Sequence, residues 1–74
     1  MITYEPFWKT MKAKNISSYK LEKQYGMTKS MIYKLKHNLN ITLATVNELC
    51  KMFDCDLLDV IAYIPDYEEA VEKK

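Results

Sequence analysis

The sequence predicts a single all-α domain, built as a compact bundle of five helices. A length of 74 residues provides one modest hydrophobic core and excludes a second domain. Apolar residues make up 49% of the chain, so that core can be filled. The chain has only one glycine and two prolines, whereas a sheet protein needs turn residues about every ten positions. Helices joined by short loops are therefore expected.

The first predicted helix begins at Glu5-Pro6 and ends near Lys14. Proline favours this start, because the first turn of a helix leaves its N–H groups without intrahelical partners. Helical spacing buries one face and leaves the lysines toward solvent. The inner residues are Phe7, Trp8 and Met11, and the outer lysines are Lys9, Lys12 and Lys14.

Two short helices follow, joined by a turn at the single glycine. Ser17 is the N-cap of a helix over about Ser18 to Tyr25, and Gly26 lies where a helix commonly ends in a left-handed conformation. Thr28 is the N-cap of the next helix, which ends near His37. This third helix is short and basic, with Ile32 and Leu35 as its buried pair.

The last two predicted helices complete the core. Thr42 caps a fourth helix with an apolar stripe of Leu43, Val46, Leu49, Cys50 and Phe53. After a turn at residues 54–56, the acids Asp56 and Asp59 favour the start of a fifth helix, which Pro65 stops. Its predicted inner face is Leu57, Leu58, Ile61 and Ile64. We therefore divide the chain into a domain over residues 1–65 and an acidic C-terminal tail over residues 66–74, which we expect to be frayed.

Composition excludes several classes of protein. Cys50 and Cys55 are too few ligands for a structural zinc site, and we expect two reduced thiols in a cytoplasmic protein. No apolar run approaches the roughly 20 residues that span a bilayer. The single histidine, His37, has no nucleophile or carboxylate at a catalytic spacing, and there is no glycine-rich phosphate loop. We expect no enzymatic activity, no cofactor, no metal and no small-molecule ligand.

Charge is divided unevenly between the two halves. Residues 1–37 hold eight lysines and two acids, a net charge of +6, whereas residues 38–74 hold three lysines and eight acids, a net charge of −5. The overall net charge of +1 hides this division. A basic half of this kind favours a polyanionic partner such as a nucleic acid.

Two short helices joined at a glycine, with the second one basic, form the pattern of a helix-turn-helix. The stretch SSYKLEKQYGMTKSMIYKLK, residues 17–36, resembles the helix-turn-helix of Cro/C1-type (XRE-like) regulators. The matching features are Leu21, Gly26, Met27, Ile32 and Leu35. The five-helix plan also resembles the lambda-repressor-like domains, and the likeness covers about residues 4–65.

This resemblance implies sequence-specific binding of double-stranded DNA, with transcriptional repression as the purpose. The second helix of the motif would enter the major groove. The family's base-facing positions fall on Thr28, Lys29, Ser30, Tyr33 and Lys34. Backbone phosphates would be contacted by Lys20, Lys36, His37 and Asn38.

Glu22 departs from the family pattern, because the family usually keeps a small residue there. Either the two helices lie slightly further apart, or the Glu22 carboxylate reaches a neighbouring lysine.

Since one recognition helix reads only a few base pairs, we expect a homodimer on a palindromic operator, weak or formed only on DNA. Its candidate interface is the acidic fifth helix and the tail. The alternative is a protein-interaction module, such as an antitoxin or adaptor, that keeps the fold without reading DNA.

Overall fold

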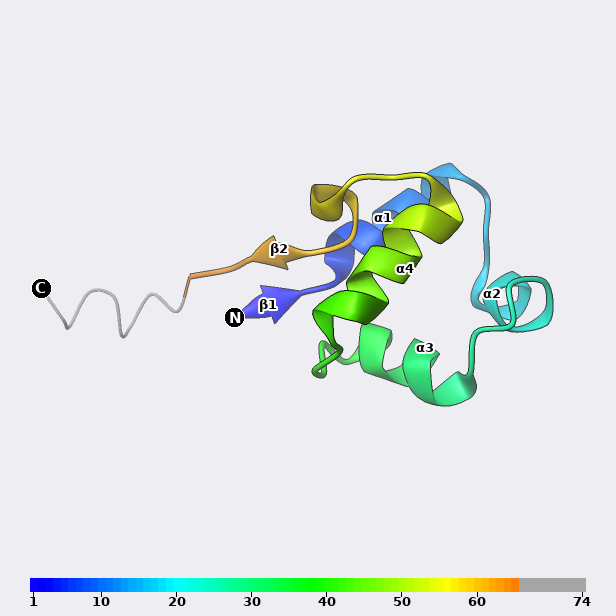
Figure 1. The fold of residues 1–74 in the computed structure, drawn as a ribbon, viewed down its shortest axis with the longest axis horizontal. Coiled ribbons are helices and arrows are strands. Elements are labelled where there is room, and N and C mark those ends of the chain that lie inside the picture. The colour runs from blue at the N-terminus through cyan, green and yellow to red at the C-terminus, as the bar shows by residue number, and fades with distance from the viewer. Residues whose placement is uncertain (66–74) are drawn as a thin grey trace, which may run out of the picture.

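The computed structural model describes residues 1–65, and its main elements are four α-helices (Figure 1). The helices are α1 (Glu5–Ala13), α2 (Ser18–Lys23), α3 (Lys29–Lys36) and α4 (Leu43–Phe53). A 3-10 turn, η1 (Leu57–Asp59), and two strands, β1 (Ile2–Thr3) and β2 (Ala62–Tyr63), complete the described part. The predicted tail over residues 66–74 lies outside the described residues.

The predicted fifth helix is wrong. The Asp56 N–H donates to the Asp59 carboxylate at 3.0 Å, as a helix start would, but the turn ends at Asp59. The chain then extends into β2, which pairs antiparallel with β1. Residues 60–64 contain β-branched and aromatic side chains, which favour a strand once a partner strand is available. The described part of the chain is still mainly helical, as predicted, since each of its two strands has only two residues.

The loss of this helix also changes which side chains are buried. Leu57, Leu58 and Ile64 of the predicted inner face are exposed and Ile61 is half-buried, whereas Val60 is fully buried. The turn presents Val60 to the core, where it joins Phe7, Met11, Leu21 and Leu35 as the most deeply buried side chains.

The rest of the predicted core is largely confirmed. Ile32, Val46, Leu49 and Phe53 are buried, and the Phe7 ring packs edge-on against Phe53 at a centroid distance of 6.0 Å. Three predicted core residues differ from the expectation: Leu43, the first residue of α4, is exposed, and Trp8 and Cys50 are only half-buried.

Each of the four helices is followed by a residue with a left-handed backbone. Gly26 has φ of 70°, as its position predicted, and a Cβ there would have no heavy atom within 4 Å. Glycine is therefore needed at this turn for its backbone angle and not for space. The other three positions carry the residues that best tolerate this conformation after glycine: Asn15, Asn38 and Asp54.

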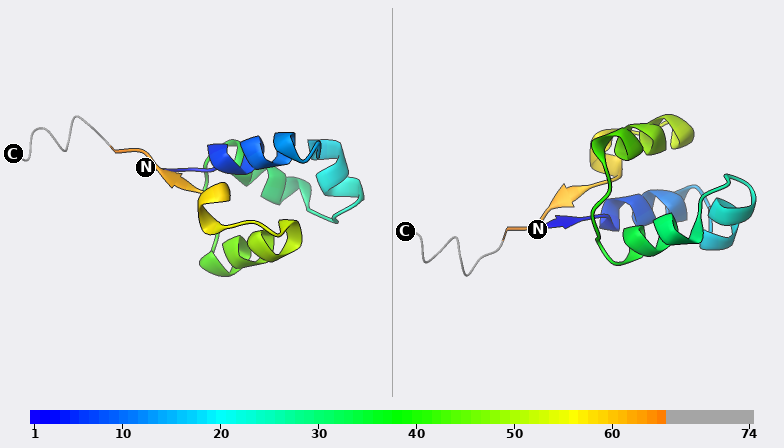
Figure 2. Two further views of the ribbon diagram at one scale, coloured as in Figure 1. Left: turned by 90° about the horizontal axis from the view of Figure 1, so that it is seen from above. Right: turned by 60° about the horizontal axis from the view of Figure 1, so that its bottom comes forward.

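The arrangement places α2 and the β1–β2 ribbon at opposite ends of the bundle. The β1–β2 ribbon and the amino terminus project from the end of the bundle that is farthest from α2 in Figures 1 and 2. The two regions therefore present separate surfaces.

Candidate nucleic-acid interface

α2, the turn at Gly26 and α3 form a helix-turn-helix, with both helix starts capped as predicted. The Ser17 hydroxyl accepts from the Lys20 N–H at 3.2 Å, and the Thr28 hydroxyl accepts from the Met31 N–H at 3.1 Å. Leu21 and Met27 anchor the motif in the core, together with Ile32 and Leu35 from α3. These contacts fix the orientation of α3.

The outer face of α3 carries polar and aromatic side chains. With 3.6 residues per turn, positions 29, 30, 33, 34 and 37 share one face, opposite Ile32 and Leu35. Lys29 and Tyr33 are among the exposed residues, and Lys34 is half-buried. The Tyr33 ring lies against the His37 ring at a centroid distance of 4.2 Å. The structure thus places Lys29, Ser30, Tyr33 and Lys34 on one face, four of the five positions to which the family resemblance assigned base contacts; the fifth, Thr28, is the N-cap of α3.

Glu22 contacts α3 through an ion pair. Its Oε2 lies 4.0 Å from Lys29 Nζ, and the Lys29 side chain is 85% exposed. Of the two alternatives for Glu22, the structure therefore shows the one in which its carboxylate reaches a neighbouring lysine. An exposed pair of this length contributes little to stability, because water screens it.

The other lysines of the helix-turn-helix form no ion pair with a described acid. Within residues 1–65, Lys29 is the one lysine that forms an ion pair with a described acid. The acids Glu48, Asp54, Asp56 and Asp59 lie on or after α4, away from the helix-turn-helix in sequence. The helix-turn-helix therefore presents a surface of net positive charge, which suits a polyanion.

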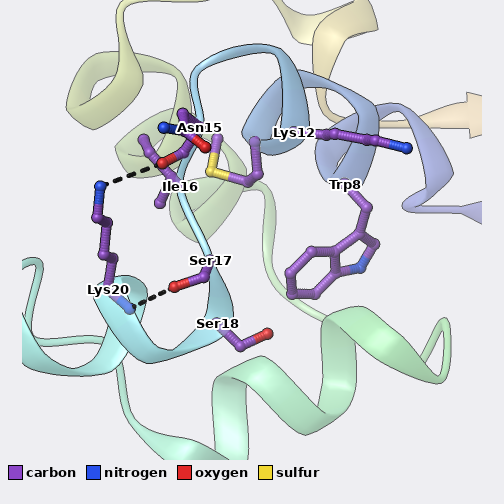
Figure 3. A pocket seen from close by; sticks show the side chains of 8 residues that line it. Trp8, Lys12, Asn15, Ile16, Ser17, Ser18 and Lys20 are labelled. Carbon is purple, nitrogen blue, oxygen red and sulfur yellow. Dashed lines mark hydrogen bonds between the residues drawn. The ribbon is translucent and has the colours of Figure 1, made fainter.

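The residues assigned to phosphate contacts are placed in different ways. Lys20 is half-buried, and its ammonium donates to the Asn15 carbonyl at 3.2 Å (Figure 3). Lys36 lies over the Trp8 ring, 5.9 Å from the ring centroid. His37 and Asn38 are both exposed at the carboxyl end of α3.

Asn38 also has a role in the fold that the sequence did not indicate. Its Oδ1 accepts from the Tyr4 N–H at 2.9 Å and from the Thr3 hydroxyl at 3.3 Å. The Tyr4 hydroxyl donates to the Leu39 carbonyl at 2.5 Å. The segment before α1 therefore holds the loop that follows α3.

Trp8 completes this attachment. Its Nε1–H donates to the Leu35 carbonyl at 3.1 Å, near the carboxyl end of α3. We call the four hydrogen bonds from Thr3, Tyr4 and Trp8 to residues 35–39 the N-terminal clamp. It joins segments about thirty residues apart, and sequence reasoning missed it because no local pattern marks such a contact.

A groove of about 440 Å³ lies between the end of α1 and the start of α2 (Figure 3). The Trp8 ring lies on one side of it, and Ser18 and Lys20 lie on the other. Lys12 and Ser17 also line the groove. These hydroxyl and ammonium groups are hydrogen-bond donors of the kind that contact phosphate oxygens. Lys12, Ser17 and Ser18 were not among the predicted site residues.

The described residues hold no cluster of metal ligands and no disulfide. Within residues 1–65, no three histidine, cysteine or acidic side chains cluster as a metal site requires. Cys50 and Cys55 are free thiols. Burial raises the pKa of the Cys55 thiol, and the nearby Cys50 and Asp59 raise it further, so this thiol stays protonated at neutral pH. None of the helices in this part of the chain has the length and apolar character needed to span a membrane.

Comparison with known proteins identifies the same motif. A family model described as the Cro/C1-type HTH DNA-binding domain matches residues 7–66. A crystal structure of the transcriptional regulator VanUg is similar, with a TM-score of 0.76 and 28% sequence identity. That alignment covers 88% of this chain and 87% of the VanUg chain. No curated protein matches the chain.

Proposed function

Because the chain belongs to the Cro/C1-type helix-turn-helix DNA-binding family, we propose that it is a repressor that reads the major groove of a duplex operator with α3. The observation that carries the proposal is the outer face of α3. Five neighbouring positions there carry donors and an aromatic ring, and apart from Lys29 the lysines of the helix-turn-helix form no ion pair with a described acid. Positive charge supplies affinity for any duplex, and side chains at base edges supply selectivity.

Each side chain of this face has a chemical role in the proposal. Lys29 and Lys34 donate to guanine acceptors, and Thr28 and Ser30 donate to base edges or to phosphates. Tyr33 packs on a thymine methyl or bonds a phosphate, with its ring supported by His37. Lys29 exchanges its partner, Glu22, for the duplex.

Phosphate contacts on both sides of α3 set its register in the groove. On one side are Lys20 and, from the groove of Figure 3, Lys12 and Ser18. On the other side are Lys36 and His37. Asn38 keeps its Oδ1 in the N-terminal clamp, so we assign its contact to the amide nitrogen.

Regulation requires more selectivity than one short helix provides. We infer that two copies bind a palindromic operator, with their α3 helices in successive major grooves about one helical turn apart.

A fluorescence-anisotropy titration with random duplex at several salt concentrations tests this function. If about five cations neutralise phosphates, log affinity should fall with log salt with a slope of roughly −4 to −5. Replacing Lys29 and Lys34 by alanine should lower the affinity for duplex DNA. The matched control removes Lys9 and Lys51, which are exposed on α1 and α4.

Three results are informative. Loss of affinity in the Lys29/Lys34 variant but not in the control supports the assignment of α3. Equal effects in both variants, or none in either, would contradict it. No affinity for random duplex even at low salt would instead favour the protein-interaction module.

A further inference from the structure

Cys50 and Cys55 lie on the two sides of the turn that ends α4. Asp54, between them, has a left-handed backbone with φ of 52°, and the Cys55 N–H donates to the Cys50 carbonyl at 3.0 Å. A left-handed residue followed by an N–H that bonds back to the last turn of the helix is a Schellman motif. The two residues joined by this hydrogen bond frequently have apolar side chains that contact each other. In this chain both residues are cysteines.

The two thiols are neighbours. Burial raises the pKa of the Cys55 thiol, and the Cys50 thiol raises it further, through its charge and as a hydrogen-bond partner. The charged groups that also act on Cys55 are Asp59, which raises its pKa, and Lys14, which lowers it. Both cysteines are half-buried and pack against the hydrophobic core. Because each keeps part of its surface exposed, a small molecule in solution can reach the pair.

We propose that Cys50 and Cys55 form a dithiol site that reacts with a low-molecular-weight disulfide and closes reversibly to an intramolecular disulfide. A disulfide requires α-carbons about 4.4–6.8 Å apart and β-carbons directed toward each other. The backbone hydrogen bond holds the two residues close, and the interaction between the thiols shows that their side chains meet. The fold therefore builds the pair before any oxidant arrives. This site goes beyond the proposed function and does not rest on it.

The disulfide forms by two successive exchanges. Because Cys55 holds its proton, the Cys50 thiolate attacks one sulfur of the small disulfide, and the small thiolate that leaves takes up the proton that Cys50 lost. The mixed disulfide removes the charge of Cys50, which is one of the causes that raise the pKa of Cys55. Cys55 then loses its proton and attacks the Cys50 sulfur, and a second small thiol leaves. Two protein thiols are oxidised and one small disulfide is reduced to two small thiols, so electrons and protons balance.

Closing the pair constrains a part of the core that supports the helix-turn-helix. Phe53 lies between the cysteines in sequence, and its ring packs against Tyr25 at a centroid distance of 5.0 Å, directly before the turn at Gly26. The disulfide closes a loop of six residues, which restricts the unfolded chain more than the folded one. The oxidised chain should therefore melt about 10 °C higher than the reduced chain.

Equilibration of the full chain with mixtures of reduced and oxidised glutathione tests the site, with the product measured by mass spectrometry. Oxidised wild type should be lighter than the reduced chain by two hydrogen atoms and should carry no glutathione. The equilibrium constant for closing the disulfide should be about thirtyfold higher for the folded chain than for the chain in concentrated urea, because the fold holds the thiols together. Cys50→Ser and Cys55→Ser cannot close the loop and should carry at most one glutathione.

Substitution of Asp54 tests whether the turn builds the site, without changing either sulfur. Asp54→Gly suits the left-handed backbone, so the folded chain should keep its preference for the disulfide. Asp54→Val strains the same backbone and should lower this preference severalfold. Circular dichroism of both variants checks that they remain folded.

The site is wrong if the folded chain closes the disulfide no more readily than the chain in urea, or if folded wild type remains a mixed disulfide with glutathione. An oxidised chain that melts below the reduced chain would also overturn the proposal, because the native turn would then have to distort to close. Equal preferences in Asp54→Gly and Asp54→Val would show that the turn does not bring the thiols together.

Discussion

The two ends of α3 are held in different ways. Its carboxyl end is tied by the N-terminal clamp, in which Tyr4, Trp8 and Asn38 connect distant segments through buried or half-buried contacts. Its amino end has one local cap, the Thr28 hydroxyl, and one exposed ion pair to Glu22. The end without buried polar contacts to distant segments is the end where the base-contacting positions begin.

This difference separates two tasks within one short helix. A recognition helix needs a fixed axis, which the clamp supplies, and it needs side chains whose partners can be exchanged, which the amino end supplies. Substitutions that break the N-terminal clamp should therefore act mainly on stability, and substitutions at the amino end should act mainly on DNA affinity.

The largest expected effect is at Asn38. Asn38→Ala removes the acceptor of the buried Tyr4 N–H and places alanine at a φ of 57°, so we expect a loss of about 3 kcal/mol in the free energy of unfolding. Urea denaturation followed by Trp8 fluorescence measures it. Asn38→Gly tolerates the backbone angle and should recover about 1 kcal/mol of this loss. A loss below about 0.5 kcal/mol in both variants would show that the clamp does not hold α3.

A smaller effect is expected at the amino end. Thr28→Ala removes the cap of α3 and should lower the free energy of unfolding by about 1 kcal/mol. Thr42 caps α4 in the same way, accepting from the Thr45 N–H at 3.0 Å, so Thr42→Ala is the matched control. The two variants should lose similar stability in thermal melts, but DNA affinity should fall only for Thr28→Ala. Equal DNA affinities of the Thr28→Ala and Thr42→Ala variants would show that Thr28 does not contact DNA.

The smallest effect is expected at Glu22. Glu22→Gln should change the free energy of unfolding by less than about 0.5 kcal/mol, because the pair with Lys29 is exposed. Affinity for random duplex should rise a few-fold, since Lys29 no longer leaves a counter-charge on binding and one negative charge near the phosphates is gone. Anisotropy titration compares this variant with Glu48→Gln on α4, for which no rise is expected. A rise in affinity for both variants would show that the effect comes from the net charge of the chain and not from the pair of Glu22 with Lys29.

The sequence predicted features that depend on local chemistry. Ser17, Thr28 and Thr42 cap helices as expected, because capping involves residues only three positions apart. The left-handed backbone of Gly26 was predicted correctly, because glycine commonly takes this conformation where a helix ends. Asn15 and Asn38 also have a left-handed backbone. Because asparagine tolerates this conformation better than most residues, the two asparagines could have been used to predict these helix ends.

Features that depend on distant partners could not be predicted in this way. The fifth helix is wrong because residues 62–63 pair with residues 2–3, across nearly the whole described chain. The N-terminal clamp is also non-local, and no periodicity marks Asn38 as its acceptor. The base and phosphate contacts stay predictions: the structure places Lys29, Ser30, Tyr33 and Lys34 on one face of α3 and the proposed phosphate contacts around it.

The most direct test of the central claim is NMR chemical-shift mapping of the ¹⁵N-labelled chain with a duplex selected from a random pool. The account predicts the largest amide shifts in residues 28–37 and at the start of α2, with α4 and η1 little changed. Shifts concentrated on α4 and η1, with residues 28–37 undisturbed, would contradict the claim that α3 reads DNA.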